Sequence, residues 1–408
     1  MRRTPILALF VFMFMIGQTA FAGRLIINSD TSDPAPKAAF TQIVADFNKA
    51  YPDIKAELNV YDHESYKTSI RNWLSSEAPD VVFWYAGERL NTFVSKDLLE
   101  PVTDVWKENN LDDKMASARS GVTFNNEQYG LPYTYYQWGV YYRKDIFDRY
   151  GIGVPKTWDE YLAACKTLKS NGITPITIGT RGLWTTGGWF DYLNLRVNGL
   201  DFHMQLMKGE IPYTDPRVKE VFARWKELIE PEYFIANHTS YSWQDAQAFL
   251  YQGKAAMYLI GNFIVPNFPE ELDGKMGFFQ FPVINPDVRM YEDAPTDILA
   301  IPARAKNKRD AKVFLSYISR PSIIRTLNDA LKQLPTHKDA GVTDNYFLNL
   351  GNEMLSTAAG TAQFYDRDTD PVMAKAGMKG FQEFMVKPDR LDKILNQIEK
   401  TRKRIYKK

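Results

Sequence analysis

The alternation of strand and helix patterns constrains the fold of this chain more than any other feature of its sequence. Residues 24–28 and 80–83 are short apolar runs typical of buried strands, and residues 54–60 alternate apolar with polar side chains. The stretches between them have the spacing of amphipathic helices, and Pro34 and Pro36 mark the start of the first one. A β-α-β-α-β order predicts a mostly parallel sheet that is covered by helices.

A second set of alternating patterns follows residue 150. Thr157 and Glu160 have the spacing of a helix capping box, and Gly172 marks the end of that helix. Residues 215–231 and 309–319 are amphipathic, whereas residues 253–261 are typical of a buried strand. The sequence therefore predicts two α/β lobes that are joined by crossovers without a long linker.

Size and cysteine content agree with two lobes. Removing a leader of 22 residues from 408 leaves 386, which is more than one hydrophobic core usually serves. Cys165 is the single cysteine, so no internal disulfide can form and the cores must stabilise the chain. The 45% hydrophobic and 14% aromatic content can fill such cores and leave aromatic side chains for a site.

The first 22 residues have the pattern of a cleavable secretory signal. Two arginines precede an apolar stretch from Ile6 to Ile16, and Ala20 and Ala22 form an A-x-A site with cleavage expected after Ala22. The alternative is a membrane anchor, which needs about 20 apolar residues. Because this stretch ends at Gly17, we expect a soluble protein that is secreted into the periplasm.

Charge and motifs argue against several classes of function. The chain has 50 basic and 49 acidic residues, whereas nucleic acids and anionic membranes require a basic surface. No nucleophile elbow, zinc-protease motif, P-loop or dinucleotide fingerprint is present in the sequence, and the four histidines have no metal-ligand spacing. Asp366, Asp368 and Asp370 match an EF-hand start, but Pro371 and Gly377 replace its required glycine and glutamate. We expect no metal, no cofactor and no catalytic residue.

Aromatic placement is the most informative signal for function. Trp73, Trp106, Trp158 and Trp225 lie in helical patterns and are expected in cores. The other five lie at strand ends or in loops: Trp84, Trp138, Trp184, Trp189 and Trp243. Residues 182–196 also place Asp191 and polar groups near two of these rings, although Trp189 could instead begin a buried helix. A pyranose has an apolar C–H face and an equator of hydroxyls, which such a mixture suits.

Four segments in order resemble the extracellular solute-binding proteins of ATP-driven sugar importers (family 1). They are PDVVFWYAGERL (79–90), YGLPYTYYQWGVYYRKDIFDRYGIGVPKTWDE (129–160), FLYQGKAAMYLIGNF (249–263) and TDILAIPARAKNKRDAKVFLSYI (296–318). The resemblance implies the two-lobed periplasmic-binding-protein fold (type II), in which each lobe is a mainly parallel sheet flanked by helices and hinge crossovers join the lobes. We place lobe one at 23–132 plus 297–338 and lobe two at 133–296 plus 339–408.

The resemblance also implies a set of ligand contacts at matching positions. Trp84 matches the family's binding tryptophan, and Glu88 with Arg89 match its acid-arginine pair, one residue further along than in the family. Phe263 stands where the family has a stacking tryptophan. It keeps a flat face but is a narrower platform, which favours a smaller ligand or a different linkage. The expected ligand-binding residues are Asp30, His63, Trp84, Glu88, Arg89, Tyr135, Trp184, Trp189, Asp191, Asn262, Phe263, Asp297, Asp366 and Arg367.

We therefore expect a monomeric, non-enzymatic substrate-binding protein of an ABC sugar importer. It would bind a mono- or oligosaccharide between its lobes and deliver it to a membrane permease. Two alternatives stay open. One is a periplasmic carbohydrate-active enzyme, because a pair of carboxylates such as Glu88 and Asp297 need only be close in space. The other is a binding protein for a charged solute, which would require a fixed ion-pair clamp.

Overall fold

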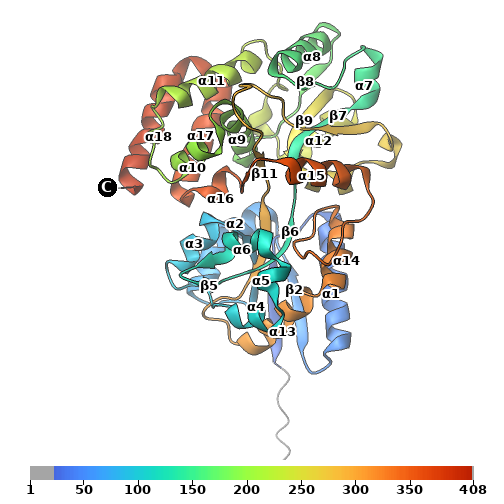
Figure 1. The fold of residues 1–408 in the computed structure, drawn as a ribbon, viewed down its shortest axis with the longest axis vertical. Helices are drawn as coiled ribbons and strands as arrows, with labels where there is room; N and C mark the ends of the chain where they lie inside the picture. The colour runs from blue at the N-terminus through green and yellow to red at the C-terminus, as the bar shows by residue number, and fades with distance from the viewer. Residues whose placement is uncertain (1–22, 407–408) are drawn as a thin grey trace, which may run out of the picture.

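The computed structural model describes residues 23–406 and contains two main sheets, each in its own lobe (Figure 1). The sheet of lobe one has the order β2-β1-β3-β12-β6, and that of lobe two has the order β10-β7-β9-β8. The lobe-one strands are β1 (Arg24–Ser29), β2 (Lys55–Val60), β3 (Val81–Tyr85), β6 (Leu131–Tyr135) and β12 (Thr296–Ala300). The lobe-two strands are β7 (Trp138–Arg143), β8 (Thr174–Ile176), β9 (Ala255–Gly261) and β10 (Met276–Phe279). The expected signal and its cleavage site lie outside the described residues.

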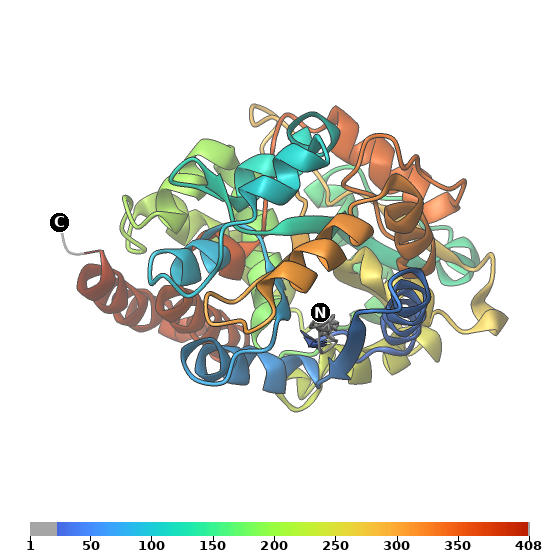
Figure 2. The ribbon, with the colours of Figure 1, turned by 90° about the horizontal axis from the view of Figure 1, so that it is seen from below.

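Helices surround the sheet of lobe one, as the view along the long axis in Figure 2 shows. Helix α1 begins with proline at its first position and buries Phe40, Ile43, Val44 and Phe47, as its spacing predicts. The lobe-one helices are α1 (Pro34–Ala50), α2 (His63–Ser75), α3 (Glu88–Val94), α4 (Thr103–Glu108), α5 (Leu111–Lys114), α6 (Ala116–Arg119), α13 (Lys308–Ile318) and α14 (Pro321–Leu331). A small hairpin of β4 (Thr123–Phe124) and β5 (Glu127–Gln128) lies beside them.

Lobe two is richer in helix. Its helix α8 begins at the predicted capping box, in which the Thr157 hydroxyl and the Glu160 carboxylate each accept a backbone N–H. The lobe-two helices are α7 (Lys144–Arg149), α8 (Trp158–Ser170), α9 (Trp184–Val197), α10 (Gly199–Met207), α11 (Pro216–Ile229), α12 (Trp243–Tyr251), α15 (Tyr346–Thr357), α16 (Tyr365–Asp368), α17 (Pro371–Val386) and α18 (Leu391–Ile405). None of the helices within residues 23–406 has the length and apolar content that a membrane span needs.

The strand pairing is mixed, which corrects the prediction of mainly parallel sheets. In lobe one β1 is parallel to β2 and β3, but β12 is antiparallel to both β3 and β6. In lobe two β8 is parallel to β9, whereas β7 is antiparallel to β9 and β10. The connections explain the difference. Because β12 and β7 follow crossovers, each strand enters its sheet at the edge between the lobes and runs away from that edge. Their neighbours, β3 and β6 in lobe one and β9 and β10 in lobe two, run toward that edge.

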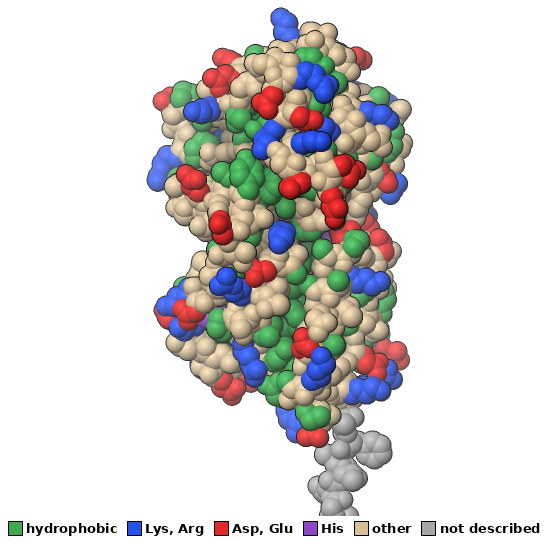
Figure 3. All heavy atoms as spheres, turned by 90° about the vertical axis from the view of Figure 1, so that its right-hand side faces the viewer, with side chains coloured by type: hydrophobic (Ala, Val, Ile, Leu, Met, Phe, Trp, Pro, Cys, Tyr) green, Lys and Arg blue, Asp and Glu red, His purple; other side chains and the backbone are tan. Residues whose placement is uncertain are grey.

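The lobes are joined by crossovers. Tyr136 and Gln137 alone separate β6 of lobe one from β7 of lobe two. The short strand β11 (Glu292–Asp293) pairs with β13 (Thr361–Ala362) and leads directly into β12. A third passage begins near Leu334, which forms a bridge to Tyr135, and leads to α15. Figure 3 shows the narrowing between the lobes, and also that acidic and basic side chains are interspersed over this face.

Each lobe has its own hydrophobic core. Trp106 is fully buried in the core of lobe one, and Trp158 and Trp225 are buried in that of lobe two. These three confirm the prediction of core tryptophans, whereas Trp73 is partly buried and packs against the core of lobe one. Cys165 is a buried free thiol of lobe two.

Candidate functional site

A cavity of about 140 Å³ lies between the lobes. It lies where β1 and β3 end and β12 begins, the edge at which open α/β sheets bind their ligands. The charged and aromatic side chains that line it are Asp30, Asp33, Phe40, His63, Lys67, Tyr85, Tyr133, Tyr136, Trp138, Trp184, Trp243, Phe263, Asp297, Phe364, Asp366 and Arg367.

Asp30 lies at the centre of a hydrogen-bonded group on lobe one. It follows β1, and its Oδ2 lies 3.2 Å from Nδ1 of His63, the first residue of α2. The Tyr85 hydroxyl donates to the same oxygen at 2.9 Å. Burial raises the pKa of Asp30, but His63 and Tyr85 lower it by more, so its pKa lies below the ordinary value. Asp30 is therefore an ionised acceptor at neutral pH.

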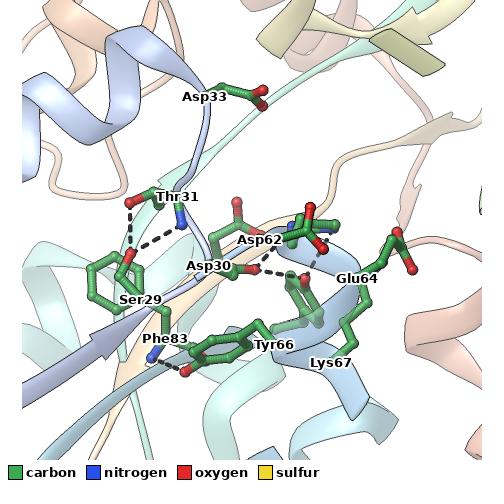
Figure 4. Close-up of polar contacts among 12 residues, drawn as sticks. Ser29, Asp30, Thr31, Asp33, Asp62, Glu64, Tyr66, Lys67 and Phe83 are labelled. Atoms are coloured by element: carbon green, nitrogen blue, oxygen red, sulfur yellow. Dashed lines mark hydrogen bonds and ion pairs between the residues drawn. The ribbon is translucent and has the colours of Figure 1, made fainter. Parts of the chain in front are cut away.

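The loop that holds Asp30 is fixed by its neighbours, as Figure 4 shows. The backbone N–H of Thr31 donates to the Ser29 hydroxyl oxygen at 3.0 Å, and the two hydroxyls lie 2.6 Å apart. On the α2 side, Asp62 accepts the backbone N–H of Ser65 at 3.0 Å and so caps the helix. These bonds set the positions of Asp30 and of the helix start that carries His63.

Arg367 on α16 connects lobe two to both neighbouring crossovers. Its guanidinium donates to Asp297 at 2.8 Å and to the Thr296 carbonyl at 3.1 Å, at the start of β12. It also donates to the Tyr136 hydroxyl at 2.8 Å, between β6 and β7. Burial raises the pKa of Asp297, although Arg367 opposes that rise. Gly87 permits this close packing: its φ is 81°, and a Cβ there would lie 2.8 Å from the Arg367 carbonyl oxygen.

A second cross-lobe pair lies next to the first. Arg89 of lobe one lies 3.7 Å from the Asp366 carboxylate of lobe two. Burial raises the pKa of Asp366, but Arg89 and Lys67 lower it by more, so Asp366 stays ionised at neutral pH. The Lys67 ammonium lies 6.0 Å from the centroid of the Trp184 ring, on the other lobe. Adjacent residues of α16 thus form opposite ion pairs with lobe one.

Lobe two supplies an aromatic wall. Trp184 begins α9, Trp243 begins α12, and Phe263 follows β9. The Trp243 and Phe263 centroids lie 5.0 Å apart at 83°, and the Trp184 and Phe263 centroids 6.0 Å apart at 66°. Trp138, at the start of β7, is 6.0 Å from Trp184 at 85°. Edge-to-face packing holds these rings rigidly at the cavity.

The structure brings half of the predicted site residues together. Those that line the cavity are Asp30, His63, Trp184, Phe263, Asp297, Asp366 and Arg367. Their contact with a ligand stays a prediction. Of the three acids that match an EF-hand start, Asp366 lines the cavity, Asp368 accepts the Gln363 and Phe364 N–H groups, and Asp370 caps α17. The three side chains thus have different local partners.

Trp84, Glu88 and Arg89 are not among the residues that line the cavity. The Trp84 side chain alternates with that of Tyr85 along β3, and its indole N–H donates to the Arg89 carbonyl at 3.1 Å. Glu88 accepts a hydrogen bond from Asn91 at 3.0 Å, and burial raises its pKa. Tyr85 lines the cavity in the place that the sequence prediction gave to Trp84.

The remaining four predicted residues have partners elsewhere in the protein. Trp189 is fully buried within α9, which favours the alternative of a buried helix. Asp191 accepts the Tyr365 backbone N–H at 2.6 Å, and Asn262 accepts from the Tyr141 hydroxyl at 2.6 Å. Tyr135 lies on β6 and pairs with Thr296.

Sequence reasoning left several lining residues out of the predicted site. Trp138 and Trp243 belong to the tryptophans that the sequence places at strand ends or in loops, and this signal could have placed them in the site. Tyr85 and Tyr136 directly follow Trp84 and Tyr135, which are predicted site residues. The prediction and the structure therefore differ by one position at both places. Lys67 lies one helical turn after His63, on the same face of α2, and this spacing could have identified it.

Comparison with known proteins agrees with the two-lobed α/β fold and with the resemblance found in the sequence. The family model described as bacterial extracellular solute-binding protein matches residues 31–323. An uncharacterized ABC transporter extracellular-binding protein of Pyrococcus horikoshii is 30% identical over 311 residues, which cover 74% of this chain and 69% of that protein. The multiple sugar-binding protein of Streptococcus mutans is 25% identical over 361 residues, 83% of this chain and 84% of that one.

Among solved structures, the bacterial solute receptor AcbH is similar at a TM-score of 0.88 with 31% identity. The match covers 94% of this chain and 100% of that receptor, which is described as having an exclusive substrate preference for β-D-galactopyranose. These matches confirm the predicted two-lobed fold. The chain therefore belongs to the family of bacterial extracellular solute-binding proteins and is the substrate-binding protein of an ABC transporter.

Proposed function

We propose that this chain binds a sugar in the interlobe cavity and delivers it to the membrane permease of an ABC importer. The composition of the cavity carries this proposal: aromatic rings of lobe two face acidic, basic and hydroxyl groups of lobe one. Aromatic rings bind the C–H face of a pyranose, and the polar groups bind its hydroxyls. The substrate preference of AcbH for β-D-galactopyranose and the name of the Streptococcus mutans relative, multiple sugar-binding protein, support the same class of ligand.

The proposed mechanism is ligand-stabilised closure. The units that move are those predicted from the sequence, 23–132 plus 297–338 and 133–296 plus 339–408. A ligand that contacts Asp30 and Asp297 on one unit and Trp184 and Phe263 on the other binds the closed form better than the open form. It therefore shifts the population toward closure, and the permease recognises the closed form.

The proposal includes the route of the protein to its place of action. We propose that residues 1–22 direct secretion into the periplasm and are removed after Ala22. The mature protein then acts there as a monomer that meets the permease at the membrane. Mass spectrometry of the secreted protein tests the cleavage site, because the mature chain is expected to begin at Gly23.

The experiment is thermal unfolding of the mature protein against mono-, di- and trisaccharides, amino acids and polyamines. A ligand at about 100 times its dissociation constant stabilises the folded state by about 2.7 kcal/mol, so a sugar is expected to raise the midpoint clearly. Trp184→Ala is expected to abolish the shift. Trp73→Ala is the control, because Trp73 is also partly buried but lies outside the cavity.

Two outcomes would contradict this function. A midpoint shift produced by charged solutes but by no sugar would assign the cavity to another class of ligand. Hydrolysis of oligosaccharides by the purified protein would favour the carbohydrate-active enzyme.

A further inference from the structure

The two walls of the cavity differ in chemistry. The lobe-two wall presents Trp184, Trp243 and Phe263, whose rings pack edge to face against one another, and beside them Asp366 and Arg367 of α16. The lobe-one wall presents Asp30, His63, Lys67 and Asp297. A ligand that fits both walls has one apolar side and one side rich in hydroxyls.

Phe40, Tyr85 and Tyr133 of the lobe-one core line the cavity, and the Tyr85 ring is already engaged by a cation. The Arg367 guanidinium lies 4.2 Å from the centroid of the Tyr85 ring, and the Lys67 ammonium lies 5.9 Å from it. The Tyr85 hydroxyl donates to Asp30. The Arg367 guanidinium therefore occupies a position over this ring that a sugar would need for stacking. Lys67 lies at nearly the same distance from the Tyr85 and Trp184 rings, and the Phe40 and Tyr133 rings pack edge to face against each other. Lobe two therefore offers Trp243 and Phe263 as the rings best placed to stack on a sugar.

The cavity has room for one ring. Its volume of about 140 Å³ is similar to that of an engineered protein cavity of about 150 Å³ that binds benzene. Two contacts between the lobes involve lining residues: the Gln244 amide donates to Asp33 at 3.4 Å, and Arg89 lies 3.7 Å from Asp366.

Most charges at the cavity are paired with an opposite charge, whereas the Asp33 carboxylate has the Gln244 amide as its side-chain partner. Asp30 is paired with His63, Asp297 with Arg367, and Asp366 with Arg89. Lys67 lies 3.3 Å from Glu64. An anionic ligand would add a charge that has no free counter-ion at the cavity and would lie near the Asp33 carboxylate, which is costly, so an uncharged ligand fits better than an anion.

We propose, on the basis of the sugar-binding function above, that the ligand is one uncharged pyranose ring with its C–H groups gathered on one face, as in galactose. The axial hydroxyl on carbon four of galactose leaves neighbouring C–H groups on the same face, whereas in glucose the C–H groups alternate between the faces. The C–H face lies on Trp184, Trp243 and Phe263. The hydroxyls of the opposite side and edge lie against Asp30, His63 and Asp297.

Titration calorimetry on the mature wild-type protein tests this inference with four probes. They are galactose, glucose as its epimer at carbon four, lactose as galactose with a second ring, and galacturonate as galactose with a carboxylate. Galactose is expected to bind, and glucose at least about tenfold more weakly, because one hydroxyl then leaves the polar wall. Lactose and galacturonate are expected to bind at least about a hundredfold more weakly.

The outcomes separate this inference from the function on which it rests. Binding of lactose or galacturonate as tight as that of galactose would overturn the single uncharged ring. Equal binding of glucose and galactose would overturn the one-sided orientation. In each of these cases the protein is still a sugar-binding protein, whereas no binding by any mono- or oligosaccharide overturns the sugar-binding function itself.

Discussion

At the scale of single residues, the Tyr85 hydroxyl helps to keep Asp30 in its ionised, ligand-accepting form. It donates to Asp30 at 2.9 Å inside the protein. We expect Tyr85→Phe to raise the pKa of Asp30 and to weaken sugar binding by about tenfold, because a hydrogen bond to a charged acceptor contributes about 1.5 kcal/mol or more. Calorimetric titration measures this. Tyr129→Phe is the control, since its hydroxyl donates to Glu127 at 3.3 Å outside the cavity.

Asp368 makes the stability of the protein dependent on pH. It accepts the Gln363 and Phe364 N–H groups, yet burial raises its pKa to about 6. Because this pKa is raised above the value of an unfolded aspartate, its stabilising effect is complete below about pH 4 and is lost as pH rises through about 6. The unfolding free energy of the wild type is expected to fall between about pH 5 and pH 7. We expect that of Asp368→Asn to fall by about 1 kcal/mol less over the same range.

Urea denaturation across this pH range measures the effect. Asp53→Asn, at an exposed position, serves as the control and is expected to leave the pH dependence unchanged. An Asp368→Asn protein that loses stability with rising pH as steeply as the wild type would contradict the assignment. Burial also raises the pKa values of Asp293 and Asp191. The stability of the Asp368→Asn variant is therefore expected to keep some pH dependence.

At the scale of elements, the capping box of α8 is a local signal that the structure retains. Thr157→Ala removes the side chain that accepts the Glu160 N–H. We expect a loss of about 1 kcal/mol in unfolding free energy, measured by chemical denaturation. Thr167→Ala, in the middle of the same helix, is the control and should change stability by much less, because its hydroxyl bonds only to a carbonyl one turn earlier.

Elements with local signals were predictable, and elements set by distant pairing were not. Helices α1 and α8 begin and bury residues where proline, capping groups and apolar spacing predict. The choice between Trp84 and Tyr85 at the cavity depends on how β3 pairs with β12, far away in the sequence. The direction of β12 in the sheet could not be predicted for the same reason, because its partners β3 and β6 are far away in the sequence. Asp366 and Arg367 were chosen because of the resemblance, and only the packing of α16 against lobe one explains why they lie at the cavity.

At the scale of the whole molecule, Arg367 of lobe two forms an ion pair with Asp297 of lobe one. We expect Arg367→Met to lower the unfolding free energy by about 3 kcal/mol, because Asp297 is left as a buried carboxylate without its cation. Urea denaturation checks this value. Arg309→Met is the control, since its pair with Asp310 is largely exposed on the arginine side and is expected to contribute less than about 1 kcal/mol.

A second variant separates lost pairing from lost packing. In the double variant Arg367→Met with Asp297→Asn no buried charge is left unpaired, so part of the lost stability is expected to return. If the double variant loses as much stability as the two single losses added together, or more, the ion pair is not the source of the effect.

The position of β12 in the sheet also determines when lobe one can fold. It lies between β3 and β6, although all of lobe two up to β11 is synthesised between β6 and β12. A chain that ends at residue 290 therefore lacks the strand that joins β3 to β6. We expect such a fragment to show no protected lobe-one amides in hydrogen exchange, in contrast to the full chain.

Because the central strand β12 is synthesised late, the sheet of lobe one can be completed only late in synthesis. The amino-terminal half leaves the ribosome first but cannot complete its own sheet until about three quarters of the chain has been made. If residues 1–22 direct secretion, as we propose, this order of synthesis would leave the leading part of the chain without its complete sheet while it awaits passage through the membrane. The topology that positions the cavity would then also favour folding after export.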